Sequence, residues 1–533
     1  MALGAPSESP AIIVKEVDLT GGVPNVQSTT GAFAGSFRWG PMDEATLVDN
    51  EATLASTFGA PNDTYAVDFF TASSFLNYAN ALQVSRSADS GALNATEDSG
   101  TAALIRNNAA WDVGTWVGKV FAKHAGTLGD SLKIQVAGPV SWATAGAGFQ
   151  GQFDAAPTGT ERHILVTDED GVITGTAGTV LERYEYVSSS STATLADGST
   201  NYEKNVINRA SNYVRINAAL DSNDSLSLSS GADGTQTTGN VQTALDAFND
   251  KDTITVDFMI APDMATAGAQ QTVVNDMVVT AGTTRKDCVV VTSPSKASVV
   301  GNADPVTATT AEAASFTYSS YLFVDNNWLK VYDKYNDKYI SIPAAGATAG
   351  IMAASDANSA PWFSPAGSRR GSYVGVAALA YTPTKAQRDT LYKAGINPIA
   401  NLPGQGILLY GDKTHMNRPS AFDRINVRRL FNVVERAVSQ AARNTLFELN
   451  DEFTRAEFVN ITEPFLREIK GRRGITDFRV VCDETNNTPA VIDRNEFIAN
   501  IFIKPARSIN YITINFVAVR SGVDFEEVAG LSV

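Results

Sequence analysis

The alternation of helices and strands in this chain stops at about residue 90, and this interruption constrains the fold more than any other feature. Before it, Ala32–Trp39 has the composition of a buried strand and Val67–Tyr78 has the apolar spacing of a helix. Residues 91–227 are rich in Gly, Ala, Ser and Thr and hold short strand-like runs with almost no helical periodicity. We therefore predict an inserted, mostly-β domain at 91–227.

The α/β pattern resumes after the insertion. Thr253–Ala261 and Cys288–Thr292 are apolar runs typical of buried strands, and helical spacing lies between them. Because a domain can continue across an insertion, residues 21–90 and 228–370 are predicted to form one α/β domain.

The final third, residues 371–533, mixes both kinds of element. Helices are predicted at Thr384–Lys393 and at Glu452–Lys470, with Pro464 interrupting or restarting the second helix. Tyr511–Val519 alternates in period two and is the strongest strand signal in the chain. The whole chain is therefore predicted to be a multidomain protein of the α+β or α/β class.

One helix, within Ser420–Asn450, has two distinct faces. Ser420 and Asp423 stand at capping-box spacing, which predicts a start at about Ala421. Apolar residues at steps of three, four and seven form one stripe: Val427, Leu430, Phe431, Val434, Val438 and Ala441. Five arginines fall on a sector roughly opposite that stripe: Arg424, Arg428, Arg429, Arg436 and Arg443. The pattern predicts one face for the core and one cationic face, which is either solvated or contacts a partner.

The net charge of −16 is unevenly distributed. The acidic excess lies in residues 1–370, whereas residues 371–533 are close to neutral and hold the arginines of the two-faced helix. An acidic surface argues against nucleic acid and anionic membranes as partners. No apolar run approaches the roughly 18 residues of a membrane span, and the first ten residues lack the features of a secretory signal.

Residues with the chemistry of catalysis or metal binding do not form a convincing set. Gly146–Gly151 matches G-x-G-x-x-G, but Pro157 and Gly159 follow and oppose the helix that a dinucleotide site needs. Asp168–Gly171 resembles part of a calcium loop without its distal glutamate, which favours a hairpin turn. The histidines and cysteines lie far apart in the sequence: His124, His163, His415, Cys288 and Cys482. We expect no catalytic residues, no metal and no cofactor; an enzyme would need a site within 91–227.

Several ordered runs resemble the tail sheath family of contractile-tailed bacteriophages, close to its T-even-like group. They are GAFAGSFRWGP (31–41), TFG (57–59), YDKYND (332–337), SPAG (364–367), AQRDTLY (386–392), LLYGDKT (408–414), FDRINVRRLFN (422–432), TPAVIDRNEF (488–497) and PARSINYITINFVA (505–518). The resemblance covers residues 1–90 and about 228–533. The insertion does not match the family clearly and is shorter than the outer region of the T-even-like sheath, which implies fewer outer domains.

The resemblance implies an architecture. It makes residues 371–533, together with an N-terminal arm at 1–20, a conserved inner α/β domain. Residues 21–90 and 228–370 become a middle α/β domain, and the insertion becomes an outer domain.

The resemblance also implies a function. Sheath subunits of the family form hexameric rings, which stack helically around an inner tail tube. They contract from a high-energy extended state and drive the tube through the host envelope. The implied partners are further copies of the chain, the tail tube protein, and baseplate and tail terminator proteins, with no direct nucleic acid and no membrane. The implied location is a virion assembled in the host cytoplasm. The alternative is the sheath of a related contractile injection system, of the type VI secretion or R-type bacteriocin kind.

Finally, the resemblance assigns roles to residues. A helix at this place in the family faces the tube, which implies a tail-tube contact for Arg424, Arg428, Arg429, Arg436 and Arg443. Arms of the family add strands to the sheets of neighbouring subunits. Ala11–Val17 is a predicted strand with no nearby hairpin partner, and Gly522–Val533 is a tail with scattered apolar residues. The implied strand residues are Ile12, Ile13, Val14, Val17, Val523, Phe525 and Val528.

Overall fold

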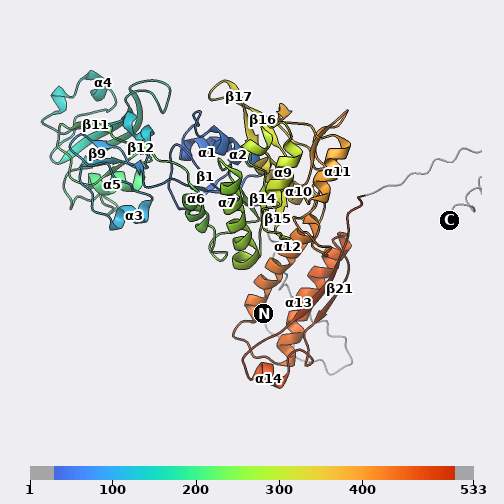
Figure 1. Ribbon diagram of the computed structural model, residues 1–533. Helices are drawn as coiled ribbons and strands as arrows, with labels where there is room; N and C mark the ends of the chain where they lie inside the picture. The colour runs from blue at the N-terminus through green and yellow to red at the C-terminus, as the bar shows by residue number, and fades with distance from the viewer. Residues whose placement is uncertain (1–28, 511–533) are drawn as a thin grey trace, which may run out of the picture.

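The computed structural model describes residues 29–510, which form three lobes (Figure 1). The inserted residues make a β-rich lobe at the left, an α/β lobe lies at the centre, and a C-terminal lobe with two long helices extends below it. Both predicted arms and the strand predicted at Tyr511–Val519 lie outside the described residues. Within residues 29–510, every helix is too short or too polar to span a bilayer.

A six-stranded sheet organises the central lobe. In spatial order its strands are β15 (Leu322–Val324), β14 (Val289–Thr292), β13 (Phe258–Ile260), β1 (Gly31–Gly35), β3 (Leu82–Arg86) and β2 (Thr46–Val48). All neighbours run parallel except β2 and β3. Phe33 of β1 lies opposite Ile260 on one side and Val84 on the other, so β1 joins strands from both sides of the insertion.

Helices cover both faces of this sheet, as a mostly parallel sheet requires. On one face, α2 (Ala66–Leu76) and α10 (Ala345–Asn358) pack against a core that includes Phe33. On the other face, α6 (Thr238–Asp246) and α7 (Ala267–Val279) pack against Ala32 and Ala34. The alternation of large and small side chains along β1 thus separates the two cores. Three further helices surround the sheet: α1 (Glu51–Phe58), α8 (Lys296–Val299) and α9 (Pro305–Ala313).

The inserted residues form an antiparallel sheet of seven strands. In spatial order these are β10 (Val214–Ile216), β6 (Val120–Ala122), β5 (Thr96–Glu97), β11 (Ser225–Ser229), β7 (Leu132–Ala137), β8 (Glu161–Asp168) and β9 (Thr179–Ser188). Helix α5 (Glu203–Ala210) packs on this sheet through Ile207, and Trp39 of the central lobe joins the same core.

The two ends of the insertion meet. Asp89 donates its N–H to the Thr235 carbonyl at 3.1 Å, and the Thr235 N–H donates to the Asp89 carboxylate, also at 3.1 Å. Beside them, β4 (Ala92–Leu93) pairs with β12 (Ala232–Asp233). The inserted lobe therefore leaves and re-enters the central lobe at one place.

The motifs singled out in the insertion have local structural roles. Ala147–Gln150 is a one-turn helix, α4, rather than the start of a dinucleotide-binding helix. The Asp168 carboxylate accepts hydrogen bonds from the Ser131 hydroxyl at 2.6 Å and the Thr174 N–H at 2.7 Å, so it fastens the turn after β8. Across residues 29–510, no three His, Cys, Asp or Glu side chains are grouped to hold a metal ion.

Small sheets and long helices build the rest of the chain. The sheet of β17 (Lys338–Pro343), β16 (Trp328–Asp333) and β18 (Ala378–Leu379) and the hairpin of β19 (Ile399–Leu402) and β20 (Gly406–Leu409) extend the central core. Helix α11 (Lys385–Lys393) begins after Thr384 with both bonds of a capping box. The C-terminal lobe contains α12 (Ile425–Ala442), α13 (Glu452–Gly471), α14 (Pro489–Ile492) and the antiparallel pair β21 (Ile475–Val481) and β22 (Asn500–Pro505).

Helix α12 begins at Ile425, so the start predicted at Ala421 is wrong. The Ser420 hydroxyl accepts a hydrogen bond from the Phe422 N–H at 3.2 Å and forms a turn instead of a helix cap. Arg424 then pairs with Lys413 in an antiparallel bridge. This bridge holds the backbone extended through Arg424, and the helix can start only after it.

Pro464 does not interrupt α13, and that prediction is also wrong. The helix is continuous over Glu452–Gly471 with Pro464 inside it. A proline in a helix removes one hydrogen bond and crowds the preceding turn. Here Leu466 and Ile469, on the same helix, are buried in the core of the C-terminal lobe, and this packing offsets the loss.

Candidate functional site

The apolar stripe of α12 packs as the sequence predicts. Leu430 and Val434 share a core with Leu466 and Ile469 of α13. The other members of the stripe are buried at Val427 and Ala441 and half-buried at Phe431 and Val438. The predicted stripe is therefore confirmed, and it attaches α12 to the C-terminal lobe.

The arginine sector faces the protein's own acidic side chains, which corrects the expectation of a cationic surface. Arg428 and Arg429 are only 5% and 3% exposed. The Arg429 guanidinium forms an ion pair with Asp356 of α10 and donates to the Met352 carbonyl at 3.0 Å. Burial lowers the pKa of Arg429 to about 9, although the charge of Asp257 opposes the shift.

Arg436 connects α12 to the central sheet at two acidic residues. It donates to the Asp257 carboxylate at 2.5 Å, and it lies 3.5 Å from the Asp287 carboxylate. Asp257 also accepts the Thr30 N–H at 3.0 Å, directly before β1. Burial raises the pKa of Asp257, while the charge of Arg436 counteracts this effect. Arg436 thus ties α12 to the point where the N-terminal segment enters the fold.

Arg424 makes the corresponding connection at the other end of the chain. It pairs with Asp412 at 2.8 Å and donates to the Tyr392 hydroxyl. Asp412 also accepts the Ser508 hydroxyl at 2.8 Å, two residues before the end of the described chain. Arg424 therefore ties the start of α12 to the last described residues of the chain.

The last two arginines have different surroundings. The guanidinium of Arg428 lies between two aromatic rings, 4.4 Å from the Tyr321 centroid and 4.5 Å from the Phe422 centroid. Arg443, by contrast, is at the surface, with 64% of its side chain exposed and an ion pair to the equally exposed Asp252. Of the five predicted tube-contact residues, Arg443 is the one with a largely exposed side chain.

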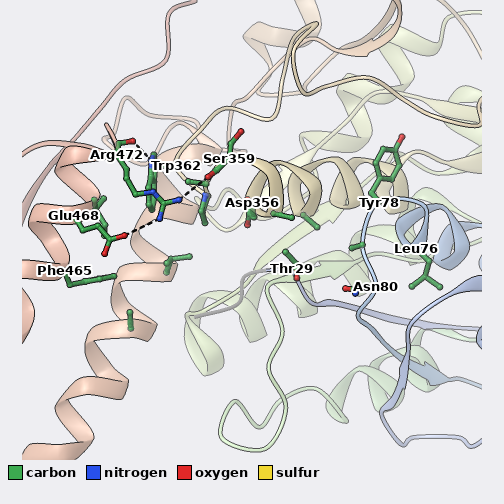
Figure 2. A pocket seen from close by; sticks show the side chains of 18 of the residues that line it. Thr29, Leu76, Tyr78, Asn80, Asp356, Ser359, Trp362, Phe465, Glu468 and Arg472 are labelled. Atoms are coloured by element: carbon green, nitrogen blue, oxygen red, sulfur yellow. Dashed lines mark hydrogen bonds and ion pairs between the residues drawn. The ribbon is translucent and has the colours of Figure 1, made fainter. Parts of the chain in front are cut away.

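A cleft of about 920 Å³ opens beside α12, between the central and C-terminal lobes (Figure 2). Ser359, after α10, lines one wall, and Phe465 and Glu468 of α13 and Arg472, directly after it, line the other. Arg472 bridges the walls, because its guanidinium donates to the Ser359 carbonyl at 3.2 Å and pairs with Glu468 at 3.5 Å. Thr29, the first described residue, also lines the cleft.

The connection between α12 and α13, together with the first turn of α13, exposes large apolar side chains that the sequence reasoning missed. They are Leu446, Phe447, Leu449 and Phe453, which are between 62% and 104% exposed. We call this group the apolar tip. Exposed patches of this kind mark interaction surfaces. A signal was available, since four large apolar residues stand within Leu446–Phe453, beyond the end of the α12 stripe at Ala441.

Two exposed strand edges lie in the same lobe. Among residues 29–510, β21 and β22 pair only with each other, so each has one edge without a partner strand. Their inner side chains Phe478, Val480, Ile501 and Ile503 are half-buried against the core of the C-terminal lobe. Such edges are templates for strands from other chains.

The family models and the curated relatives all match this chain to phage tail sheath proteins. Residues 234–415 match the family described as "Phage tail sheath protein central domain", and residues 417–518 match "Phage tail sheath C-terminal domain". The chain is 32% identical to the tail sheath protein of Vibrio phage KVP40, over 98% of this chain and 99% of the relative. It is 31% identical to the tail sheath protein of Enterobacteria phage T4, with the same coverage.

A solved structure extends the similarity to the fold. A sheath tail protein from Listeria innocua matches 91% of this chain and 93% of its own, with a TM-score of 0.59 at 13% identity. The alignment with the KVP40 protein runs over 667 positions, whereas this chain has 533 residues. The phage relative therefore has residues that this chain lacks.

Proposed function

The chain belongs to the phage tail sheath family and is a structural subunit of a contractile tail sheath, and we propose that six copies form each ring of a helix around an inner tail tube. In this proposal, contraction from an extended, high-energy state drives the tube through the host envelope. The protein works by assembly and rearrangement, without a catalytic step.

The extent of the similarity to the phage relatives supports this proposal most directly. It covers nearly all of this chain and nearly all of each relative. If the proteins shared only a single domain, the alignment would cover only part of one chain or of the other. The type VI secretion and bacteriocin alternatives are less favoured, because both of these relatives are phage proteins.

We propose the domain division and the further partners on the same basis. Residues 371–533 with the arm at 1–20 are the inner domain, residues 21–90 with 228–370 the middle domain, and 91–227 the outer domain. Baseplate and tail terminator proteins contact the two ends of the sheath, which assembles in the host cytoplasm.

The arms are proposed to knit neighbouring subunits by strand addition. The proposed strand residues are Ile12, Ile13, Val14 and Val17 in the N-terminal arm, and Val523, Phe525 and Val528 in the C-terminal arm. The two unpaired edges of β21 and β22 supply places where such strands can pair. Strand addition uses main-chain hydrogen bonds, so it can persist while subunits rotate.

Helix α12 is proposed to transmit force between the arms. Arg436 and Asp257 hold the start of β1, and Arg424 and Asp412 hold the chain near Ser508. Because these ion pairs are buried or half-buried, breaking one leaves a charge that water does not reach. The bases of both arms therefore move together with α12 as one rigid joint.

The tube contact of the five arginines remains a proposal, and we assign its main part to Arg443. Its side chain is exposed and lies close in sequence to the apolar tip. A surface ion pair contributes roughly 0.2–1 kcal/mol and is screened by salt. Contacts this weak can hold the extended state over many rings and still release during contraction.

Truncation of the arms tests the assembly proposal. We expect the purified full-length chain to form tubes visible by electron microscopy, and chains lacking 1–20 or 521–533 to remain soluble, folded monomers. Circular dichroism and a cooperative thermal transition serve as the control for folding.

Two results would contradict two different parts of the proposal, the strand exchange and the sheath function. Tubes formed after removal of both arms would refute strand exchange. Absence of any tube or ring from the intact chain, under conditions in which it stays folded, would contradict the sheath function itself.

A further inference from the structure

A small cavity lies where the inserted lobe meets the central lobe. It has a volume of about 340 Å³, within the range of cavities that hold small ligands. Trp39 and Thr57 line it from the central lobe. Lys123, His124 and Arg215 line it from the insertion. A ligand here would contact both lobes at once.

Basic side chains converge on this cavity with unused hydrogen-bonding capacity. His124 and Arg215 are 8% and 4% exposed. Within residues 29–510, neither Nδ1 of His124 nor Nε of Arg215 has a hydrogen-bond partner. Buried polar atoms are almost always paired, so two orphaned nitrogens on one cavity wall call for a ligand.

The remaining polar contacts orient the basic groups. Arg215 donates from Nη2 to the Asn108 side-chain oxygen at 2.6 Å, and its guanidinium lies 5.4 Å from the centroid of Trp111. Lys123 donates from Nζ to the Ser211 carbonyl at 2.6 Å. These contacts fix both side chains without neutralising their charges.

The lining of the cavity carries two cationic side chains, Lys123 and Arg215, and one carboxylate, Glu44. Glu44 is the acidic residue in the lining and acts on both cations, and the charges of Glu182 on Lys123 and of Asp112 on Arg215 act more strongly from outside the lining. Burial, with the charges of Lys123, Arg86 and Arg215, nevertheless holds the pKa of His124 well below its usual 6.5. His124 is thus a neutral imidazole surrounded by cations, and a metal cation has no place there.

We propose that this cavity binds a small oxyanion, inorganic phosphate or a small carboxylate, between Lys123, His124 and Arg215. A guanidinium and an ammonium group form strong, charge-assisted hydrogen bonds to such oxygens. The imidazole donates from Nδ1 in the tautomer that places its proton there. The hydroxyls of Ser56 and Thr57 complete the site from the central lobe. The bound anion fastens the inserted lobe to the rest of the subunit.

Thermal unfolding of the full-length chain tests the site. The protein is prepared in a phosphate-free buffer at pH 7.5, and sodium phosphate or sodium acetate is titrated against sodium chloride at equal ionic strength. At about ten times the dissociation constant, we expect a Tm increase of roughly 1–2 °C over chloride with at least one of the two anions. Lys123→Gln and Arg215→Gln should abolish this increase.

A matched variant and a direct measurement complete the experiment. Lys133→Gln, on β7, removes a basic group that pairs with Glu169 outside the cavity, and it should keep the full increase. If Arg215→Gln does not fold, binding is measured on wild type by the change in the His124 imidazole NMR signals on addition of phosphate. No increase beyond chloride with either anion, an equal increase in Lys123→Gln, or unmoved His124 signals would overturn the proposal.

Discussion

At the scale of single residues, the arginines of α12 show how a charge pattern depends on what lies across from it. Arg429 meets Asp356, and Arg436 meets Asp257 and Asp287. Judged from its own sequence alone, α12 has a cationic face. In the folded chain, aspartates from distant segments cover most of that face and turn it into an internal joint.

The Arg436–Asp257 pair gives a prediction about stability. Arg436→Met leaves the buried Asp257 carboxylate without its counter-charge, and we expect it to lower the free energy of unfolding by roughly 3–5 kcal/mol. Removing the charge of Asp257 as well, in the double variant with Asp257→Asn, should recover a large part of this loss. Chemical denaturation of the soluble, arm-truncated chain measures both values.

Arg443→Met is the matched control for that prediction. Its ion pair with Asp252 is exposed on both sides, so the free energy of unfolding should change by less than about 1 kcal/mol. Equal losses for Arg436→Met and Arg443→Met would contradict the role of the buried pair.

Asp325 gives a prediction about pH. It is fully buried, and burial raises its pKa to about 7 from 3.8, although hydrogen bonds from Ser293, Asn327 and Thr348 oppose the shift. The folded state therefore binds this proton more tightly than the unfolded state. The stability that this group supplies is full below about pH 4 and is lost as the pH rises through 7.

Asp325→Asn removes that dependence, because the amide does not ionise. We expect the Tm of the variant, relative to wild type, to improve from pH 5 to about pH 7 and then to level off. Asp154→Asn, at an exposed position of the insertion, should run parallel to wild type over the same range. A constant difference between Asp325→Asn and wild type would show that Asp325 does not titrate as argued.

At the scale of elements, sequence periodicity predicted the helices and apolar stripes that depend on neighbouring residues in the chain. The stripe of α12 and the helix predicted at Thr384–Lys393 are both present in the structure. The predicted start of α12 was wrong, because the bridge between Lys413 and Arg424 keeps the backbone extended and overrides the cap signal of Ser420. The partners of the arginines could not be predicted, since periodicity says nothing about which distant residues a helix face will meet.

The apolar tip also belongs to the scale of elements, and it gives a prediction about assembly. Arg443→Glu combined with Phe447→Ser changes only exposed side chains, so the fold should be unaffected within about 0.5 kcal/mol. We expect the variant to self-assemble but to fail to assemble around purified tail tubes in a co-sedimentation assay.

Lys338→Glu provides a charge reversal of the same sign on β17, away from the tip. It should leave co-sedimentation with tubes unchanged. If the Arg443→Glu, Phe447→Ser variant still forms normal sheaths around tubes, the connection between α12 and α13 does not contact the tube.

At the scale of the whole molecule, the insertion behaves as an attached unit. Because Asp89 and Thr235 are hydrogen-bonded to each other, residues 91–233 can be replaced by two glycines without moving the ends. We expect the shortened chain to fold cooperatively, with lower stability because Trp39 loses its place in the core of the insertion.

Circular dichroism and thermal unfolding check this prediction. Electron microscopy shows whether the shortened chain still forms tubes. Replacing Trp39 by Gln in the shortened chain should reduce aggregation without further loss of stability. An unfolded product in both forms would mean that the central sheet depends on the inserted lobe.

The position of β1 has a mechanical consequence. The segment that precedes Thr29 continues directly into β1, which lies inside the six-stranded sheet between β13 and β3. Both neighbours run parallel to it, so a pull on the N-terminal segment loads two hydrogen-bond ladders at once and in shear. Ladders loaded in shear resist tension together instead of opening bond by bond. A subunit pulled by its neighbour can therefore bear tensile load through the middle of its six-stranded sheet.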